Sequence, residues 1–78
     1  MNVENRVLII VENLTATQGL TSRQLLLDEG ILDSLTTIDL ITKLEQDFGI
    51  DIDTDDMSHH NFNSIESITK LLIYKISK

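Results

Sequence analysis

Apolar residues recur at helical spacing near the start of this chain. Between residues 2 and 14 they fall three or four positions apart on one side, at Val3, Val7, Ile10, Val11 and Leu14. A period of about 3.6 residues is that of an amphipathic helix with one buried face. The pattern predicts a first helix over about residues 2–14.

A second periodic segment covers residues 34–48 and is followed by Gly49, the residue type that most often ends a helix. At about 100° per residue, five apolar side chains fall in one arc and are predicted to face the core: Leu40, Leu44, Phe48, Ile41 and Ile38. Leu35 falls outside this arc, among polar residues on the side of Asp39 and Thr42. The pattern therefore predicts a second helix with an exposed leucine near its start.

The last periodic segment predicts a helix that ends near residue 76, with its inner side formed by Ile65, Ile68, Leu72 and Ile76. The residues before it have the pattern of a capping box, with Asn63 as the cap and the Glu66 side chain reaching back. Lysines gather toward the end of this helix, where the helix dipole favours cations: Lys70, Lys75 and Lys78.

Two segments between the helices lack a sustained period. Residues 15–33 are rich in leucine and isoleucine, and an irregular segment of this length is usually functional or held down by its own side chains. We expect its leucines to pack down as it crosses the molecule, with one short turn near residues 22–27. Residues 51–61 are acidic and are predicted to contain a short further helix capped by Asp53 or Thr54.

Together these elements predict an all-α fold. We expect a small four-helix bundle of three main helices plus one short helix, with a long loop between helices one and two. A length of 78 residues suits a single domain, residues 1–78, around one hydrophobic core.

Composition and charge exclude several functions. The chain has no cysteine, which rules out disulfides, thiolate metal sites and a cysteine nucleophile. Its net charge is −7, and residues 28–56 hold ten acidic residues against one base, Lys43. This balance disfavours nucleic acid, whose phosphates require clustered Lys and Arg. An acidic surface either keeps a small protein in solution or attracts basic patches on partner proteins.

No membrane or export segment is indicated. The apolar run over residues 7–11 stops at Glu12 and is too short for a signal core or a membrane span. We expect a cytoplasmic protein with no membrane span.

Ser34 is the candidate site residue, because it stands where the irregular segment meets the second helix. The first N–H groups of a helix have no intrahelical partners, and the helix dipole favours an anion there, so a phosphate ester on Ser34 would lie in a favourable field. Serine is also a common N-cap with no further role. Asp33 competes for the capping position, and if Asp33 caps the helix, the Ser34 hydroxyl is left free toward solvent. The residues alone leave both interpretations open.

Several segments between Gly30 and Leu72 carry a specific pattern in combination. They are residues 30–35 (GILDSL), 38–41 (IDLI), 44–50 (LEQDFGI), Ile52 and 62–68 (FNSIESI). This pattern resembles the phosphopantetheine-dependent carrier proteins, namely the acyl carrier proteins and their aminoacyl and peptidyl carrier relatives. The Asp-Ser-Leu triplet is weak by itself, but the surrounding helix frame makes the resemblance specific.

The resemblance implies a cofactor and a role for it. Ser34, with Asp33 beside it, would receive a 4′-phosphopantetheine arm from coenzyme A through a separate, magnesium-dependent phosphopantetheinyl transferase. The thiol of the arm would then hold an acyl or aminoacyl group as a thioester. The chain has no thiol of its own, so the cofactor supplies the chemistry and the protein supplies position. The protein itself would not be an enzyme.

The resemblance also implies partners. An acyl- or aminoacyl-activating ligase would load the arm, and a downstream transferase or synthase would unload it. Leu35, Asp39 and Glu45 of the second helix are implied to contact these enzymes, through weak encounters that salt screens. We expect the carrier to be a monomer.

Three departures from the family pattern bear on the cargo. Thr36 stands where fatty-acid carriers commonly have an acid, and Thr42 where they often have methionine. Peptidyl carriers of large assembly lines often have glycine and histidine before the serine, where this chain has Leu32 and Asp33. Residues 62–65 are similar to those of stand-alone carriers that hold amino acids or unusual acyl groups. We therefore expect a free-standing carrier in a specialised pathway.

The main alternative is an unmodified acidic helical module that binds protein partners through the second helix. It would use Leu35 and the acidic residues but would need no reactive serine. No Ser-His-Asp set, glycine-rich phosphate loop or paired carboxylate with a pocket is evident, so an enzyme is disfavoured.

The sequence disfavours two possible metal sites. Asp51, Asp53 and Asp55 fit the first positions of a calcium loop, but Asp56 replaces its turn glycine and residue 62 is not the final glutamate. His59 and His60 are adjacent, and neighbouring side chains on a helix point about 100° apart, which does not suit a shared metal ion.

Overall fold

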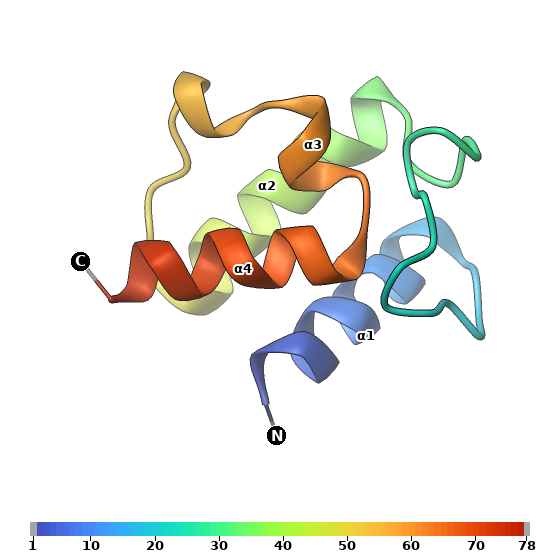
Figure 1. Ribbon diagram of the computed structural model, residues 1–78, viewed down its shortest axis with the longest axis horizontal. Coiled ribbons are helices and arrows are strands. Elements are labelled where there is room, and N and C mark those ends of the chain that lie inside the picture. Colours follow the sequence, from blue (N-terminus) through green and yellow to red (C-terminus); the bar gives the residue numbers. More distant parts are fainter. Residues whose placement is uncertain (1, 78) are drawn as a thin grey trace.

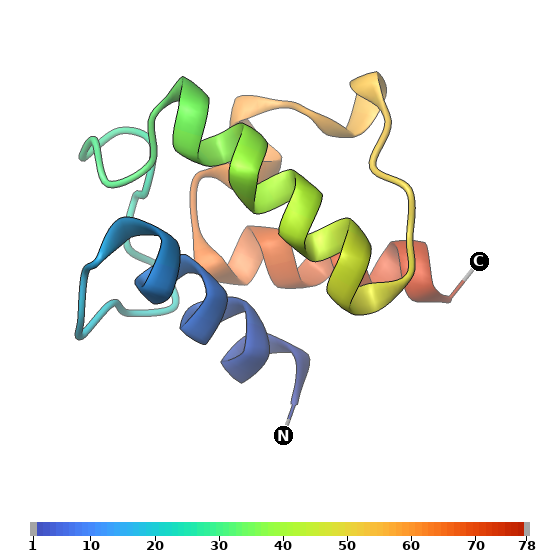
Figure 2. The same ribbon diagram turned by 180° about the vertical axis from the view of Figure 1, so that it is seen from behind.

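Helices are the regular secondary structure of the computed structural model, which describes residues 2–77. In chain order they are α1 (Val3–Thr15), α2 (Ser34–Phe48), the 3-10 helix η1 (Thr54–Asp56), α3 (His59–Phe62) and α4 (Ile65–Ile76). Figure 1 shows α4 lying across α2, with α1 below both and residues 49–58 arching over the top. Seen from behind in Figure 2, α1 and α2 slope in the same direction and lie next to each other. The predicted all-α, four-helix arrangement is confirmed.

The ends of the long helices follow from their capping residues. Asn2 caps α1, since its side chain accepts a hydrogen bond from the Asn5 N–H at 2.8 Å. The bounds predicted for α2 are confirmed, and Gly49 ends this helix in the left-handed region with φ 64°. A residue with a side chain is disfavoured in that region, which explains the glycine.

The buried residues form one apolar cluster to which every long helix contributes. From α1 they are Val7, Ile10 and Val11, from α2 Leu40, Ile41 and Leu44, and from α4 Ile65, Ile68, Leu71 and Leu72. Phe62 of α3 is 2% exposed and lies within the same cluster. Phe48 packs against the cluster and is partly buried.

Three apolar residues that the pattern assigned to the core are exposed. Ile38 is 60% exposed, Ile76 48% and Leu14 37%. The inner stripe of α2 runs through Thr37, Leu40, Ile41 and Leu44, and Ile38 lies about 100° around the helix from Thr37. The assignment of Ile38 to the core was therefore wrong. Leu14 and Ile76 lie in the last turns of α1 and α4. The helical spacing of apolar residues continues there, although these two side chains are exposed.

The long loop is held to the molecule by its leucines, as expected for most of them. Leu20, Leu26 and Leu32 are buried, whereas Leu25 is 46% exposed. The loop turns where the Glu29 N–H donates to the Leu25 carbonyl at 2.8 Å. The Glu66 N–H at the start of α4 donates to the Ser22 carbonyl of the loop at 2.9 Å. The loop is thus tied to α4 without being helical.

The start of α4 differs from the predicted capping box. Ser64 is the cap, and its hydroxyl accepts a hydrogen bond from the Ser67 N–H at 3.0 Å. Asn63 ends α3 instead, which frees its side chain for the loop. The Glu66 carboxylate turns to Arg23 at 3.4 Å and to Lys70 at 3.9 Å rather than back to the cap. The box failed because a serine one position later has the same capping ability.

The acidic segment contains two short helices where one was predicted. Asp53 caps η1, as one of the two predicted choices, and α3 begins separately at His59 after its cap Ser58. Lys75 of α4 fixes η1 to the bundle, because its ammonium lies 2.6 Å from Asp56. Lys75 therefore serves an ion pair as well as the helix dipole. Lys78, predicted to lie near the same helix end, falls outside the described residues.

Within residues 2–77, every helix falls short of the length and apolar character that crossing a membrane requires.

Candidate functional site

Ser34 is the first residue of α2, and Asp33 is the cap of that helix. The backbone of Asp33 is extended, and its Oδ1 accepts a hydrogen bond from the Thr36 N–H at 2.8 Å. Ser34 is exposed, and within residues 2–77 its hydroxyl makes no hydrogen bond. Asp33 therefore provides the cap, and Ser34 is exposed beside it.

The Asp33 carboxylate is held in its charged form. The backbone N–H and the hydroxyl of Thr36 both bond to it and hold the pKa of Asp33 below its ordinary value. This carboxylate therefore satisfies first-turn N–H groups at neutral pH. A second anion at Ser34 would need donors of its own.

The chain leading to Ser34 is fixed by the turn that precedes it. Leu32 is 2% exposed, and its N–H donates to the Leu26 carbonyl at 3.0 Å. Asp28 is bound by His59 of α3 at 2.8 Å and by the Asn63 side chain at 3.2 Å. These contacts hold the segment before α2 against the α3–α4 corner, so the serine has a defined position.

Asn63 has a different role at this corner from the one predicted, which was to cap the last helix. Its Oδ1 accepts from the N–H groups of Leu27 at 3.0 Å and Asp28 at 3.2 Å, while its carbonyl accepts from the Leu26 N–H at 2.8 Å. These hydrogen bonds join distant parts of the chain: Leu27 and Asn63, for example, are 36 residues apart. A local pattern contains no signal for such a pairing.

The outward face of α2 contains two large apolar residues. Leu35 is 76% exposed, as predicted, and Ile38 is 60% exposed. Asp39 is exposed on the same side of the helix. Glu45 is half-buried, and its Oε2 accepts a hydrogen bond from the Ile52 N–H at 2.8 Å, so this carboxylate also serves the fold.

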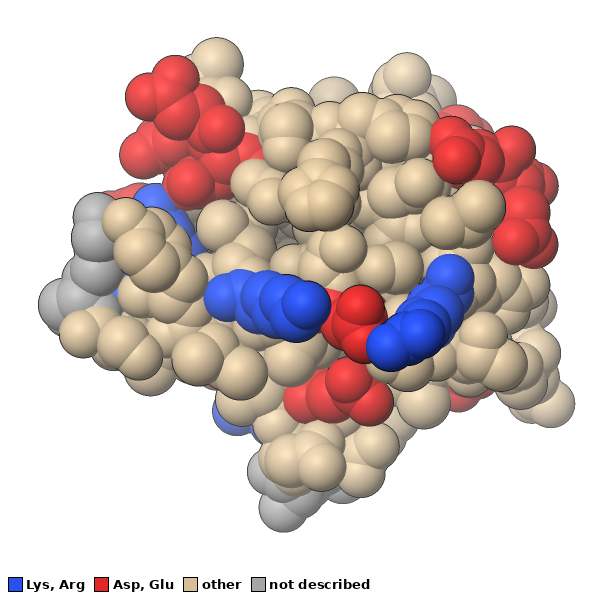
Figure 3. All heavy atoms as spheres, viewed as in Figure 1, with Lys and Arg blue, Asp and Glu red and all other residues tan. Residues whose placement is uncertain are grey.

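Charge is distributed unevenly over the surface. Figure 3 shows acidic side chains gathered at two corners of one face, over η1 and over the turn that leads into α2. Between them, along α4, basic and acidic side chains alternate, as in the Arg23–Glu66–Lys70 row. On this face, the acidic residues of segment 28–56 are thus seen over η1 and over the turn that leads into α2.

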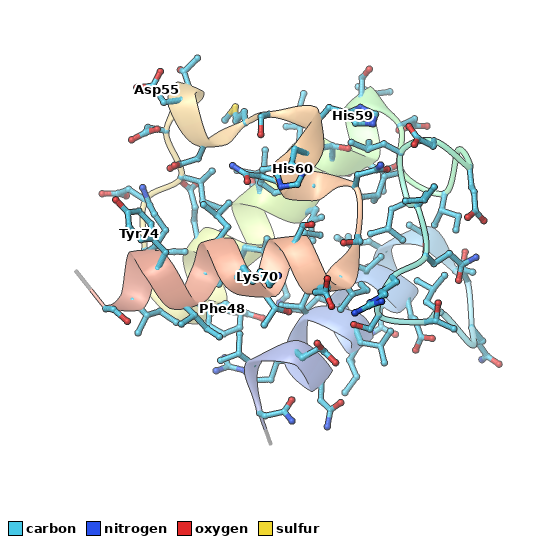
Figure 4. The ribbon with its side chains drawn as sticks, viewed as in Figure 1. Phe48, Asp55, His59, His60, Lys70 and Tyr74 are labelled. Atoms are coloured by element: carbon cyan, nitrogen blue, oxygen red, sulfur yellow. The ribbon has the colours of Figure 1, made fainter. Side chains whose placement is uncertain are left out.

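The two histidines of α3 lie apart from each other. Figure 4 shows His59 and His60 pointing in different directions from α3, and His59 is paired with Asp28. Within the described residues, His, Asp and Glu side chains form no cluster of three that could hold a metal ion.

Comparison with known proteins establishes the class. Residues 7–72 match the family described as "Phosphopantetheine attachment site". The chain is also 33% identical over 70 residues to the D-alanyl carrier protein of Enterococcus faecalis (strain ATCC 700802 / V583), an alignment that covers 87% of this chain and 90% of that protein. The chain therefore belongs to the phosphopantetheine-dependent carrier proteins. Its cofactor is covalently attached 4′-phosphopantetheine, and as a carrier it is not itself a catalyst.

The arrangement at the start of α2 fits this cofactor. Attachment requires an accessible hydroxyl, and Ser34 is exposed. A positive helix end suits the phosphate that the arm carries. When bound, the arm supplies the thiol that this cysteine-free chain lacks.

Proposed function

We propose that residues 1–78 form one carrier domain in which Ser34 bears the 4′-phosphopantetheine arm. The observation that carries this proposal is that Ser34 is exposed and its hydroxyl is not needed to cap α2, because Asp33 is the cap. Two other described serines stabilise helix ends, since the hydroxyls of Ser58 and Ser64 cap α3 and α4. Ser34 also lies inside the residues that match the attachment family.

The attachment step is a phosphoryl transfer. The Ser34 oxygen bonds to the phosphorus that carries pantetheine in coenzyme A, and the bond from that phosphorus to the second phosphate breaks. Adenosine bisphosphate leaves, and the serine proton passes to a base of the transferase. The carrier contributes an accessible oxygen at a fixed position.

We propose an aminoacyl cargo, with D-alanine as the first candidate. The Enterococcus relative is by its name a D-alanyl carrier protein. The interior gives further support, since Phe62, Leu40 and Leu72 are at most 2% exposed and fill the space among the helices. A long acyl chain would have to displace these side chains, whereas a short polar group can remain in solvent.

Partner enzymes are proposed to dock on the outward face of α2. Leu35 and Ile38 provide an apolar centre, and Asp39 provides charge for a basic partner surface. Glu45, also assigned here by the family resemblance, contributes with the carboxylate oxygen that Ile52 does not occupy. The partners are the phosphopantetheinyl transferase, an aminoacyl-activating ligase and a downstream transferase. A cytoplasmic monomer stays a prediction.

Membership of the attachment family disfavours the alternative of an unmodified interaction module. Intact mass after incubation with coenzyme A, magnesium and a promiscuous phosphopantetheinyl transferase separates the two. We expect one added arm in the wild type and none in Ser34→Ala. Ser58→Ala is the matched control, because it removes another exposed serine, one that caps a helix, and it should be loaded fully. Loading of Ser34→Ala would overturn the assignment.

The cargo is tested on the loaded protein. D-alanine and octanoate are attached to the arm in parallel, and side-chain resonances of Phe62 and Leu40 are compared with those of the unacylated form. We expect D-alanyl loading to leave both unchanged. Insertion of the octanoyl chain with displaced core resonances, together with failure of an aminoacyl ligase to load the arm, would favour a fatty-acyl carrier.

A further inference from the structure

Thr37 lies on the inner stripe of α2 and has an unusual environment. Its hydroxyl oxygen is buried and has no hydrogen-bond partner, and in the part of the chain from 2 to 77 it alone among buried side-chain N and O atoms is in this state. Buried hydroxyls are normally paired, because an unpaired one loses its bonds to water. An unpaired group in a folded protein therefore requires an explanation.

Other threonines within the helices show the usual arrangement. The hydroxyls of Thr15, Thr42 and Thr69 each donate to the carbonyl four residues earlier, at 2.8, 3.2 and 2.8 Å. Thr37 does not make the corresponding bond to the Asp33 carbonyl, which accepts the Thr37 N–H at 2.9 Å. Its hydroxyl is left available for another acceptor.

Thr37 is one helical turn from Ser34. Residues three apart on a helix are surface neighbours, with Cβ atoms about 5–6 Å apart. Helical side chains also lean toward the N-terminus, so that of Thr37 leans toward Ser34. The Ser34 side chain leans the same way, so a phosphate oxygen on it has to turn back along α2 by one turn to meet the threonine hydroxyl.

A phosphate on Ser34 finds few other donors. Asp33 already takes the Thr36 N–H. The basic side chains of residues 2–77 are engaged elsewhere: Arg6 with the Asp47 carbonyl, Arg23 and Lys70 with Glu66, Lys43 with Asp47, and Lys75 with Asp56. His59 is bound to Asp28. Beside the backbone N–H groups at the start of the helix, the Thr37 hydroxyl is the nearest side-chain donor of α2 that makes no hydrogen bond within residues 2–77.

We propose that Thr37 is a positioning residue for the cofactor, and that its hydroxyl donates a hydrogen bond to a phosphate oxygen of the arm on Ser34. The inference rests on the proposed attachment at Ser34. Threonine in a helix populates two side-chain rotamers, so the hydroxyl can turn from the interior toward the phosphate. A hydrogen bond to a charged oxygen is stronger than one between neutral groups. The arm would therefore be held at its root while its thiol end stays mobile.

The test compares apo and loaded forms of Thr37→Val, which removes the hydroxyl at nearly constant shape. Thr42→Val is the matched control, because Thr42 is on the same helix and its hydroxyl is satisfied internally. Each protein is loaded, its intact mass is measured, and the thermal midpoint and the ³¹P chemical shift of the phosphodiester are recorded. Thr37→Ala is measured alongside in case the valine variant does not fold.

Apo Thr37→Val should be at least as stable as the wild type, since an unpaired hydroxyl is removed. The change in thermal midpoint on loading should be more favourable in the wild type and Thr42→Val than in Thr37→Val, and only Thr37→Val should move the ³¹P resonance. Equal changes on loading with unmoved ³¹P shifts in fully loaded protein would overturn the role of Thr37 alone. Absence of the added mass in the wild type would instead overturn the attachment at Ser34.

Discussion

The two halves of α2 use their side chains in opposite ways. In the second half, Leu44 is fully buried, Glu45 binds the Ile52 N–H, and Lys43 pairs with Asp47 at 3.5 Å. In the first half, Leu35 is 76% exposed and the Ser34 hydroxyl is uncommitted. One end of the helix is thus built into the fold, and the other is left available to a cofactor and to partners.

This contrast explains how much of the molecule could be predicted from its sequence. The bounds of α2 were predictable because the Asp33 cap, the helical period and Gly49 are local signals. Whether Ile38 is buried could not be predicted in this way. A residue at the flank of a helix is covered only if a neighbouring element packs against it. Ile38 stays 60% exposed, whereas Leu40, two residues further along the helix, is fully buried.

The candidate site divides in the same way. Exposure of Ser34 and Leu35 follows from local position, and the attachment itself was implied by a resemblance to a family. The contacts of Asn63 with Leu27 and Asp28, and the unpaired Thr37 hydroxyl, depend on how distant segments meet. Sequence periodicity has no means of specifying such contacts.

The largest effect is expected for leucine truncation in the two halves of the helix. Leu44→Ala should lower the free energy of unfolding by about 2–5 kcal/mol, because it leaves a cavity in the core. Leu35→Ala should change it by less than about 0.5 kcal/mol, because that side chain is exposed. Urea denaturation of both variants measures the difference. Similar losses in the two would contradict the division of α2 into a packed and an available half.

A smaller loss of stability is expected at the corner that holds the entrance to α2. Asn63→Ala removes the acceptor of the Leu27 and Asp28 N–H groups and should cost about 1–3 kcal/mol. Hydrogen exchange should show faster exchange of those two amides. Asn13→Ala, at an exposed position of α1, is the control and should leave them unchanged. Unaltered protection in Asn63→Ala would mean that the loop is held by its leucines alone.

Charge reversal on the available half should affect transfer and leave stability unchanged. Asp39→Lys should slow loading by a basic partner several-fold at low salt, and the difference should shrink as salt is added. Asp55→Lys, an exposed reversal on η1, serves as the control. Equal rates for both variants at low salt would place the docking surface elsewhere. Initial rates of arm transfer at several salt concentrations provide the measurement.

The smallest effect is expected from the ion pair that anchors η1. The hydrogen bond from Lys75 lowers the pKa of Asp56, and that of Lys75 is raised by the same bond. A lowered carboxylate pKa stabilises the fold above the ordinary value of about 3.9, and this contribution is lost as the pH falls through the folded-state pKa. The raised lysine pKa contributes fully below the ordinary value of about 10.4, and this contribution is lost as the pH rises through the folded-state pKa.

Thermal midpoints of the wild type and Asp56→Asn across this range test the ion pair. The wild type should be the more stable protein at neutral pH, and its advantage should diminish at both extremes. An advantage that persists unchanged under acid conditions would show that the carboxylate charge is not involved.

The central claim is that one oxygen, Ser34 Oγ, holds the cofactor. The direct measurement is fragmentation mass spectrometry of proteolytic peptides from the loaded protein, which locates the arm on a single residue. The account predicts the arm on Ser34 and on no other serine or threonine. An arm found on Ser22, Ser58 or any other hydroxyl would contradict it.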